Sequence, residues 1–144
     1  MSVEVEIVHE ASQEVVDAFG RLLPQLSSTA ALLDLEAVDR VVRCETNTVL
    51  VARDGGEIVG TLTLVVFPVL TGVRARIEDV VVDVSARGKG VAAALTRRAL
   101  DLAREAGART VDLTSCPDRE AANRLYERLG FRARGSTVYR FPME

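Results

Sequence analysis

The stretch VDVSARGKGVAAALTRRAL, residues 82–100, runs from β-branched residues through a turn with two glycines into an alanine-rich segment. Because the first N–H groups of a helix have no partner inside it, they point outward and attract anions. Gly88 and Gly90 carry no side chain that would keep an anion away from such groups. Arg87 and Lys89 add two positive charges. The pattern therefore predicts a site for a diphosphate group at the beginning of a helix.

The segment after this turn has the periodicity of an amphipathic helix. Its apolar stripe consists of four residues at helical spacing: Val91, Leu95, Ala99 and Leu102. Gly107 follows at the position where a C-terminal cap is expected. A helix with one apolar stripe packs on a sheet, so we expect this segment to cover one face of a sheet.

The chain has 144 residues, of which 48% are hydrophobic, and a formal net charge of −3. That length fits one domain, residues 1–144, with a substantial core. No apolar run reaches the ~18 residues of a membrane span, and the N-terminus lacks the basic start and apolar block of a secretory signal. We therefore expect a soluble, cytoplasmic protein. The negative charge argues against broad binding of nucleic acid, which depends on many Lys and Arg contacts to phosphate.

The cysteines and the histidine form no metal-binding pattern. Cys44 and Cys116 are not in CxxC spacing, and His9 is the one histidine, so we expect free thiols and no metal site. Cys116 acting with His9 as an acyl-transferring nucleophile is an alternative, but no sequence spacing links the two residues.

Hydrophobic periodicity predicts strands and helices along the whole chain. The clearest feature is a hairpin over residues 48–66, in which Asp54-Gly55-Gly56 supplies the positive-φ positions of a tight turn. The other predicted strands cover residues 3–7, 74–83 and 108–115, with one or two closing strands in 131–141. The other predicted helices run from Ser12 to Pro24, around 35–42 and over 118–129. This order indicates a three-layer mixed α/β domain.

Two separated motifs resemble those of a known enzyme family. RGKGVA (87–92), after EDVVVD (78–83), resembles the (Q/R)xxGx(G/A) signature of the GNAT superfamily of acyl-CoA-dependent N-acyltransferases. ANRLYERLGF (122–131) resembles the family's second signature, a helix containing LY followed by GF. The resemblance implies a single N-acetyltransferase domain with a GNAT-like α/β fold. In that fold three α/β/α layers contain four helices and a mixed, mostly antiparallel sheet of about six or seven strands.

The resemblance also implies where acetyl-CoA binds as the co-substrate. The pantetheine arm adds like an extra strand where two strands splay apart, and here it would meet the backbone of Val80, Val81 and Val82. The diphosphate would be held by the turn and the first helical residues, which are Arg87, Gly88, Lys89, Gly90, Val91 and Ala92. The resemblance implies no metal.

Dinucleotide binding is a competing interpretation of the same glycines. Gly88, Gly90 and Ala93 fit the GxGxxA variant of the Rossmann fingerprint, and Asp112 follows at about the distance of a ribose-binding acid. A Rossmann domain, however, places this fingerprint directly after its first strand, whereas here it comes late and after a hairpin.

The resemblance assigns the acid of the reaction to Tyr126. In the resembling enzymes the tyrosine of the LY pair lies near the thioester sulfur, where it protonates or positions the leaving thiolate. One departure concerns the asparagine that many members have seven residues earlier, because Arg119 occupies that position here. Asn123 lies one helical turn before Tyr126 but is out of register with that role.

The reaction also needs a proton acceptor, because an alkylammonium with a pKa of ~10.4 is almost fully protonated at pH 7. Glu78 is the favoured acceptor. A regular strand would put it on the same face as Val80 and Val82. A β-bulge would bring Asp79 forward instead, and a water chain is a third possibility.

These features predict an enzyme that transfers the acetyl group of acetyl-CoA to a primary amine by direct attack. The segments expected to bind the acceptor, residues 22–38 and 67–73, are mostly apolar and suit an anionic sugar phosphate poorly, although Arg74 and Arg76 are available. A small amine, an amino acid, an antibiotic or a peptide N-terminus all remain open as acceptors, and a homodimer is a family-level expectation. The alternative is a non-catalytic acyl-CoA-binding or regulatory module, which would need the glycine turn but neither Glu78 nor Tyr126.

Overall fold

A computed structural model describes residues 3–143, and contacts within the chain divide it into two units. The first unit ends at Thr114 and the second begins at Ser115. In chain order, the first unit contains β1 (Val3–Ile7), α1 (Gln13–Leu26), α2 (Leu35–Arg43), β2 (Asn47–Asp54), β3 (Glu57–Val69), β4 (Gly72–Val82), a short 3₁₀ turn (Val84–Ala86), α3 (Val91–Glu105) and β5 (Val111–Asp112). The second unit contains α4 (Glu120–Arg128).

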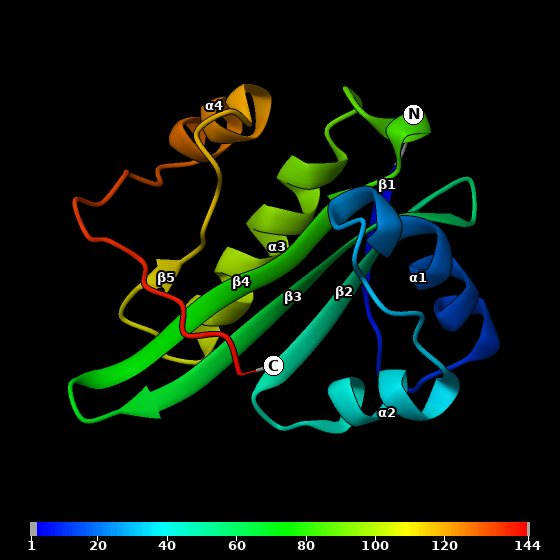
Figure 1. The fold of residues 1–144 in the computed structure, drawn as a ribbon, viewed down its shortest axis with the longest axis horizontal. Coiled ribbons are helices and arrows are strands. Elements are labelled where there is room, and N and C mark those ends of the chain that lie inside the picture. The colour runs from blue at the N-terminus through cyan, green and yellow to red at the C-terminus, as the bar shows by residue number, and fades with distance from the viewer. Residues whose placement is uncertain (1–2, 144) are drawn as a thin grey trace. The chain divides into compact units, whose positions relative to one another are not determined.

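Within residues 3–143 the sheet has five strands in the order β1-β2-β3-β4-β5. Its first four strands are antiparallel neighbours, and β5 pairs with β4 in parallel. Figure 1 shows β2, β3 and β4 as long ribbons that lie side by side. The predicted hairpin is confirmed, since Asp54 pairs with Glu57 across a two-residue turn. The turn residues Gly55 and Gly56 have φ values of 61° and 89°, which glycine adopts without strain.

Helices cover both faces of this sheet. The core on one face joins α1 and α2 to the strands through Val15, Phe19, Leu22, Val38, Val51 and Val81, among others. The other face packs against α3, whose Val91 and Leu95 lie directly over Gly60 of β3. The predicted α/β class, with a mixed, mostly antiparallel sheet and four helices, is confirmed.

Gly60 allows α3 to approach the sheet closely. A Cβ atom at this position would lie 2.9 Å from Cγ1 of Val91 and 3.2 Å from Cδ1 of Leu95. Both distances are shorter than ordinary van der Waals contact, and the β-branched Val91 has little rotamer freedom with which to move away. Because Gly60 has no side chain, the N-terminal part of α3 can lie in close contact with β3.

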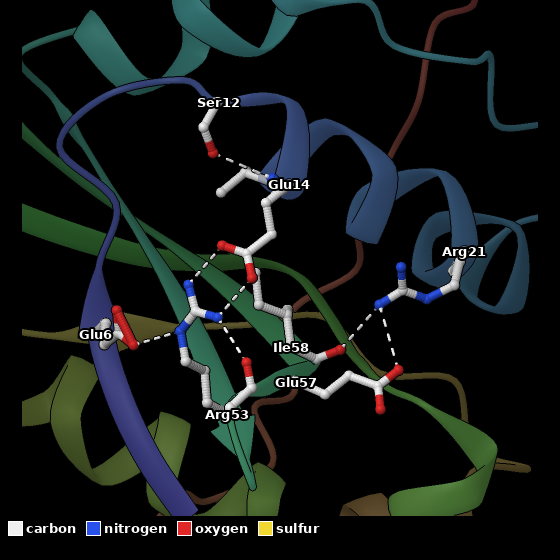
Figure 2. Close-up of polar contacts among 9 residues, drawn as sticks. Glu6, Ser12, Glu14, Arg21, Arg53, Glu57 and Ile58 are labelled. Atoms are coloured by element: carbon white, nitrogen blue, oxygen red, sulfur yellow. Dashed lines mark hydrogen bonds and ion pairs between the residues drawn. The ribbon is translucent and has the colours of Figure 1, made fainter.

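Arg53 of β2 ties three elements together (Figure 2). Its guanidinium binds the carboxylate of Glu14 on α1 through two hydrogen bonds of 2.8 and 2.9 Å, and it donates to Glu6 of β1 as well. A fourth bond, of 2.8 Å, reaches the carbonyl of Gly56 in the hairpin turn. The hydrogen bond from Arg53 lowers the pKa of Glu14 below its usual value. This bidentate arrangement sets the position of α1 relative to the sheet edge.

Helix α1 continues beyond the predicted end at Pro24 and runs to Leu26. Proline lacks the N–H that would bond to the carbonyl of Gly20, but both residues are exposed, so water can satisfy that carbonyl. The N-terminus is as predicted, because the Ser12 hydroxyl accepts a hydrogen bond from the N–H of Val15. No helix within residues 3–143 is both long and apolar enough to cross a membrane.

The prediction of about six or seven strands was wrong, because the described residues form five. The segment expected to supply closing strands, 131–141, contains no strand, and residues 132–143 are exposed. A strand is stabilised by a partner ladder and a buried face, and the exposed residues here have no buried face. The strand predicted over 108–115 is reduced to Val111–Asp112, since β5 pairs with β4 only at Ala75 and Arg76.

Replacing Gly60 with alanine should destabilise the protein. The added Cβ overpacks the contact with α3, so we expect Gly60→Ala to lower the free energy of unfolding by about 1–3 kcal/mol. Chemical denaturation measures this change. The matched control is Gly20→Ala in α1, where a Cβ would meet nothing within 4 Å. This control should raise stability by about 0.5–1 kcal/mol through helix propensity, and equal effects of the two substitutions would contradict the close contact.

Candidate functional site

The turn before α3 is built from two glycines with a left-handed backbone. Gly88 and Gly90 have φ values of 79° and 78°, and Gly90 is the N-cap residue of α3. This cap has no side-chain hydrogen bond to the helix, so the first N–H groups of α3 are left for a ligand. The strand, turn and helix predicted around residues 82–100 are therefore present, and the helix begins at Val91.

The space around the two glycines is open. A Cβ atom at Gly88 or Gly90 would meet nothing within 4 Å. Glycine is needed here because of the left-handed conformation, which costs other residues about 1–2 kcal/mol, and not because the protein itself crowds the turn. A ligand can thus lie directly over the N–H groups.

Two basic side chains flank the turn. Nζ of Lys89 lies 3.9 Å from Oδ2 of Asp54, and Nε of Arg87 donates to the carbonyl of Val82 at 3.4 Å. Both contacts are long, and both basic residues are exposed. Such surface contacts contribute little, so either cation can turn toward an anion at low cost.

β4 offers an unpaired backbone edge that leads toward this turn. β5 pairs with β4 only at Ala75 and Arg76, and within residues 3–143 no strand pairs with this side of β4 over 77–82. This free side of β4 runs past the three predicted pantetheine-binding residues, Val80, Val81 and Val82, the last two of which pair with β3 on the opposite side. Backbone donors and acceptors of an edge strand can pair with an extended ligand. The structure therefore brings the predicted cofactor-binding residues together along one path from β4 to α3.

A β-bulge interrupts β4 at Asp79. Thr63 of β3 pairs with Glu78, and Thr61 pairs with Val81, so one residue of β3 faces two residues of β4. Asp79 has a φ of 53°, and it is the one non-glycine residue in 3–143 with a positive φ. Aspartate is among the few residues that adopt this conformation readily.

The bulge corrects one sequence-based expectation. Glu78 was expected to share a face with Val80 and Val82 in a regular strand. The extra residue shifts the alternation, so Glu78 shares a face with Val81 instead. The β-bulge that would favour Asp79 over Glu78 is present, and which of the two carboxylates is the base stays a prediction.

The two neighbouring carboxyl groups have different surroundings. Oε2 of Glu78 accepts a hydrogen bond of 3.0 Å from Nε of Arg76 at the surface. Asp79 is also exposed to solvent, but on one side it borders a mainly apolar pocket of about 70 Å³. Partial burial raises the pKa of the Asp79 carboxyl above its usual value, and the charge of Glu78 adds to the rise. Glu78 is therefore held by a cation, whereas ionisation of Asp79 is opposed by its environment.

In the second unit, the residues of the LY and GF motif lie at the C-terminal end of α4, and each of them has a structural role there. Gly130 has a φ of 104°, and its N–H bonds to the carbonyl of Glu127. The N–H of Phe131 bonds to the carbonyl of Tyr126 at 2.9 Å, and the two rings meet edge to face with centroids 5.7 Å apart. These contacts form a Schellman motif with its hydrophobic contact, which fixes the position of the Tyr126 ring on the helix.

The phenol of Tyr126 stays protonated near neutral pH. Burial raises its pKa above the usual value, and the positive charge of Arg119 opposes the rise only partly. Asn123 donates from Nδ2 to the carbonyl of Cys116 at 3.1 Å, which holds the loop before α4. The amide nitrogen of the Asn123 side chain is therefore used in a hydrogen bond within the protein.

Two other sequence-based interpretations can be compared with the structure. The dinucleotide-binding alternative is wrong, because a Rossmann domain needs a mainly parallel sheet, whereas among the strands of residues 3–143 only β4 and β5 pair in parallel. Cys116 and Cys44 are exposed free thiols. Within residues 3–143 no group of three His, Cys, Asp or Glu side chains could hold a metal ion.

The sequence did not identify the pocket beside Asp79. Its lining comes from α1, the following loop, α2 and three strands, which are brought together only by folding. The signal in the sequence was the excess of apolar residues over positions 22–38, but such residues equally predict an ordinary core.

Comparison of the sequence with known protein families and proteins identifies its family. The model of a family described as "Acetyltransferase (GNAT) family" matches residues 13–131. A glucosamine 6-phosphate N-acetyltransferase from Trypanosoma brucei brucei is 44% identical over 81 residues, which cover 54% of this chain and 53% of that protein. N-alpha-acetyltransferase 30 from Schizosaccharomyces pombe is 44% identical over 55 residues, or 38% of this chain and 36% of that protein. The chain thus matches about half the length of the first relative and about a third of the second.

A solved structure resembles this chain over nearly its whole length. The crystal structure of a transcriptional regulator from Bacillus halodurans C-125 has a TM-score of 0.84 and 28% identity, covering 97% of this chain and 99% of that one. The similarity shows a shared fold.

Replacing Asp79 with asparagine should stabilise the protein at neutral pH. A carboxyl whose pKa is raised in the folded state contributes stability below its unfolded pKa of about 3.9, and this contribution is lost as the pH rises through the folded value. Asparagine tolerates the positive φ but carries no charge. We therefore expect Asp79→Asn to have a higher Tm than the wild type at pH 7, with the difference narrowing as the pH falls toward 3.

Glu78→Gln is the matched control for this measurement. It removes the neighbouring charge but also the ion pair with Arg76, so we expect no comparable gain in Tm. A lower Tm for Asp79→Asn than for the wild type at pH 7 would contradict the partial burial of the Asp79 carboxyl.

Proposed function

This chain belongs to the acetyltransferase (GNAT) family, and from that premise we propose that it transfers the acetyl group of acetyl-CoA to a primary amine by direct attack. One observation carries the proposal above all: the uncapped N-terminus of α3 lies at the end of a path that begins at the unpaired edge of β4. The family match takes in residues 13–131, which supports one acetyltransferase domain over residues 1–144. A cytoplasmic location and a homodimer stay predictions.

The residues present suit the co-substrate. The open turn with its positive-φ glycines would receive the diphosphate on the N–H groups of Gly88 to Ala92, with Arg87 and Lys89 adding charge. The backbone of Val80, Val81 and Val82 would pair with the amide groups of the pantetheine arm. Acetyl-CoA supplies the acetyl group activated as a thioester. No metal has a role in this scheme.

The transfer needs one proton acceptor and one proton donor. As the amine nitrogen forms the new C–N bond, the C–S bond of the thioester breaks, and CoA leaves as a thiol. The bound ammonium first loses one proton to solvent. As the neutral amine attacks, a carboxylate of β4 takes the second proton from the nitrogen and a phenol gives a proton to the sulfur, after which exchange with solvent restores both groups. No covalent intermediate on the protein is required, so Cys116 has no part in the reaction.

The acceptor of the proton is Glu78 or Asp79, and the surroundings favour Asp79. The Glu78 carboxylate already accepts a hydrogen bond of 3.0 Å from Arg76, so one of its oxygens is occupied. The raised pKa of Asp79 brings it closer to the range of an effective general base. In this proposal Glu78, which the sequence favoured as the base, instead helps to raise the pKa of Asp79 through its negative charge.

The proton donor in this proposal is Tyr126. The assignment rests on the resemblance of ANRLYERLGF to the second signature of the family. The raised pKa of the phenol supports it, because a tyrosine that remains protonated near neutral pH can give its proton to a thiolate.

The alternative is a non-catalytic acyl-CoA-binding or regulatory module. One observation favours it, since the similar protein from Bacillus halodurans is named a transcriptional regulator. This alternative requires the turn before α3 and the edge of β4 but no role for the carboxylates or Tyr126.

Thiol release from acetyl-CoA in the presence of a panel of primary amines tests the proposal. The wild type should release CoA in step with acetylated amine. Tyr126→Phe and Asp79→Asn should each lower kcat by about 100-fold or more, because each removes a proton-transferring group. Glu78→Gln is the control at the neighbouring position and should lower kcat by less than about tenfold.

Acetyl-CoA binding, measured by calorimetry, distinguishes an enzyme from a non-catalytic acyl-CoA-binding module. Binding that survives in all variants, together with no turnover of any amine by the wild type, would contradict the enzyme and support the module. A larger loss in Glu78→Gln than in Asp79→Asn would assign the base to Glu78.

A further inference from the structure

We propose that the acceptor is an amine attached to a compact apolar group, with the nitrogen bound at Asp79 and the apolar group inside the pocket that this residue borders. The inference rests on the proposed function and narrows its substrate. It excludes acceptors whose recognition depends on a phosphate group.

The pocket is small and mostly apolar. Its volume is about 70 Å³, and seven of its ten lining residues are apolar: Phe19, Leu23, Leu33, Val38, Val41, Val42 and Val49. The others are Thr61, Thr63 and Asp79. An apolar cavity of about 150 Å³ holds benzene, so this volume suits a group of a few carbon atoms and not an aromatic ring.

Asp79 gives the pocket a single charge at one place. It is the one charged residue among the lining residues, and within 3–143 it forms no ion pair. The hydroxyl of Thr61 is already used, because it donates to the carbonyl of Leu50 at 2.8 Å. A cationic amine therefore finds one carboxylate beside an apolar wall, which fixes the orientation of the amine and its substituent.

An anionic acceptor would find no counter-charge in this pocket. None of the ten lining residues is Lys or Arg. Arg76 shares the strand with Asp79, but its guanidinium is bound to Glu78 at 3.0 Å and to the hydroxyl of Thr114 at 3.2 Å. A phosphate near Asp79 would be repelled by the carboxylate. In this respect the chain differs from what the name of its glucosamine 6-phosphate relative would suggest.

If the pocket buries the apolar group of the acceptor, kcat/KM should depend on the size of that group. Each methylene removed from water contributes about a fourfold gain in binding. Because about 70 Å³ has room for only a few carbon atoms, larger groups should gain no further burial there, and overpacking should oppose them.

The test uses acetyl-CoA and four amines: glycinamide, alaninamide, valinamide and phenylalaninamide, with glucosamine 6-phosphate as the anionic comparison. We expect kcat/KM to rise about fourfold from glycinamide to alaninamide and about 60-fold from glycinamide to valinamide. It should fall for phenylalaninamide, and glucosamine 6-phosphate should be a poorer acceptor than valinamide.

Two adjacent leucines provide matched variants. Leu33 lines the pocket, whereas Leu32 is 85% exposed and does not. Leu33→Ala should reduce the ratio of kcat/KM for valinamide to that for glycinamide by about tenfold, because part of the apolar wall is lost. Leu32→Ala should leave this ratio unchanged, and acetyl-CoA binding measured by calorimetry should be the same in both variants.

The outcomes separate this inference from the proposed function. Turnover of amines without a preference for valinamide over glycinamide, or with a preference for glucosamine 6-phosphate, would overturn the inference and leave the acetyltransferase intact. An equal effect of Leu32→Ala and Leu33→Ala would also overturn it. Turnover of none of the amines, with acetyl-CoA still bound, would overturn both.

Discussion

The unpartnered N–H groups at the start of α3 are the feature on which the account depends. They exist because Gly90 caps the helix without a side chain and because Gly88 and Gly90 hold a left-handed turn in open space. Their position is set by packing, since the missing side chain of Gly60 lets Val91 and Leu95 press against the sheet. In the proposed role, these backbone N–H groups would bind the diphosphate, and their place against the sheet would keep the cost of reorganisation small when a ligand binds.

The β-bulge places Asp79, the proposed proton acceptor, on the same strand that leads to the turn before α3. In a regular strand Asp79 would alternate with its neighbours, but the extra residue turns its carboxyl toward the pocket lined by α1 and α2. The same strand keeps its other edge unpaired beyond Arg76. One strand therefore carries both an edge without a partner strand and a carboxyl group of raised pKa. Arg53 contributes indirectly, because it fixes α1, which supplies Phe19 and Leu23 to the pocket wall.

Local sequence patterns predicted the elements whose signals are local. The glycines at 55–56 and 88–90 predicted their turns, and the spacing from Val91 predicted α3, because these features depend on backbone conformation and helical periodicity. The sequence left the bulge at Asp79 as one of several alternatives and did not identify the pocket, since both depend on how β3 pairs with β4 and on which helices lie over that pair. The closing strands were predicted from the composition of 131–141, which is β-rich but has no buried face in the structure. Tyr126 illustrates a mixed case, because the Schellman motif explains its neighbours Gly130 and Phe131 while its chemical role rests on resemblance.

The most direct measurement compares the binding of coenzyme A with that of pantetheine, which lacks the diphosphate, by isothermal titration calorimetry. If the start of α3 holds the diphosphate, coenzyme A should bind at least about 100-fold more tightly than pantetheine, and Gly90→Val should remove most of this difference. Equal affinity for the two ligands, or a difference that survives Gly90→Val, would contradict the account.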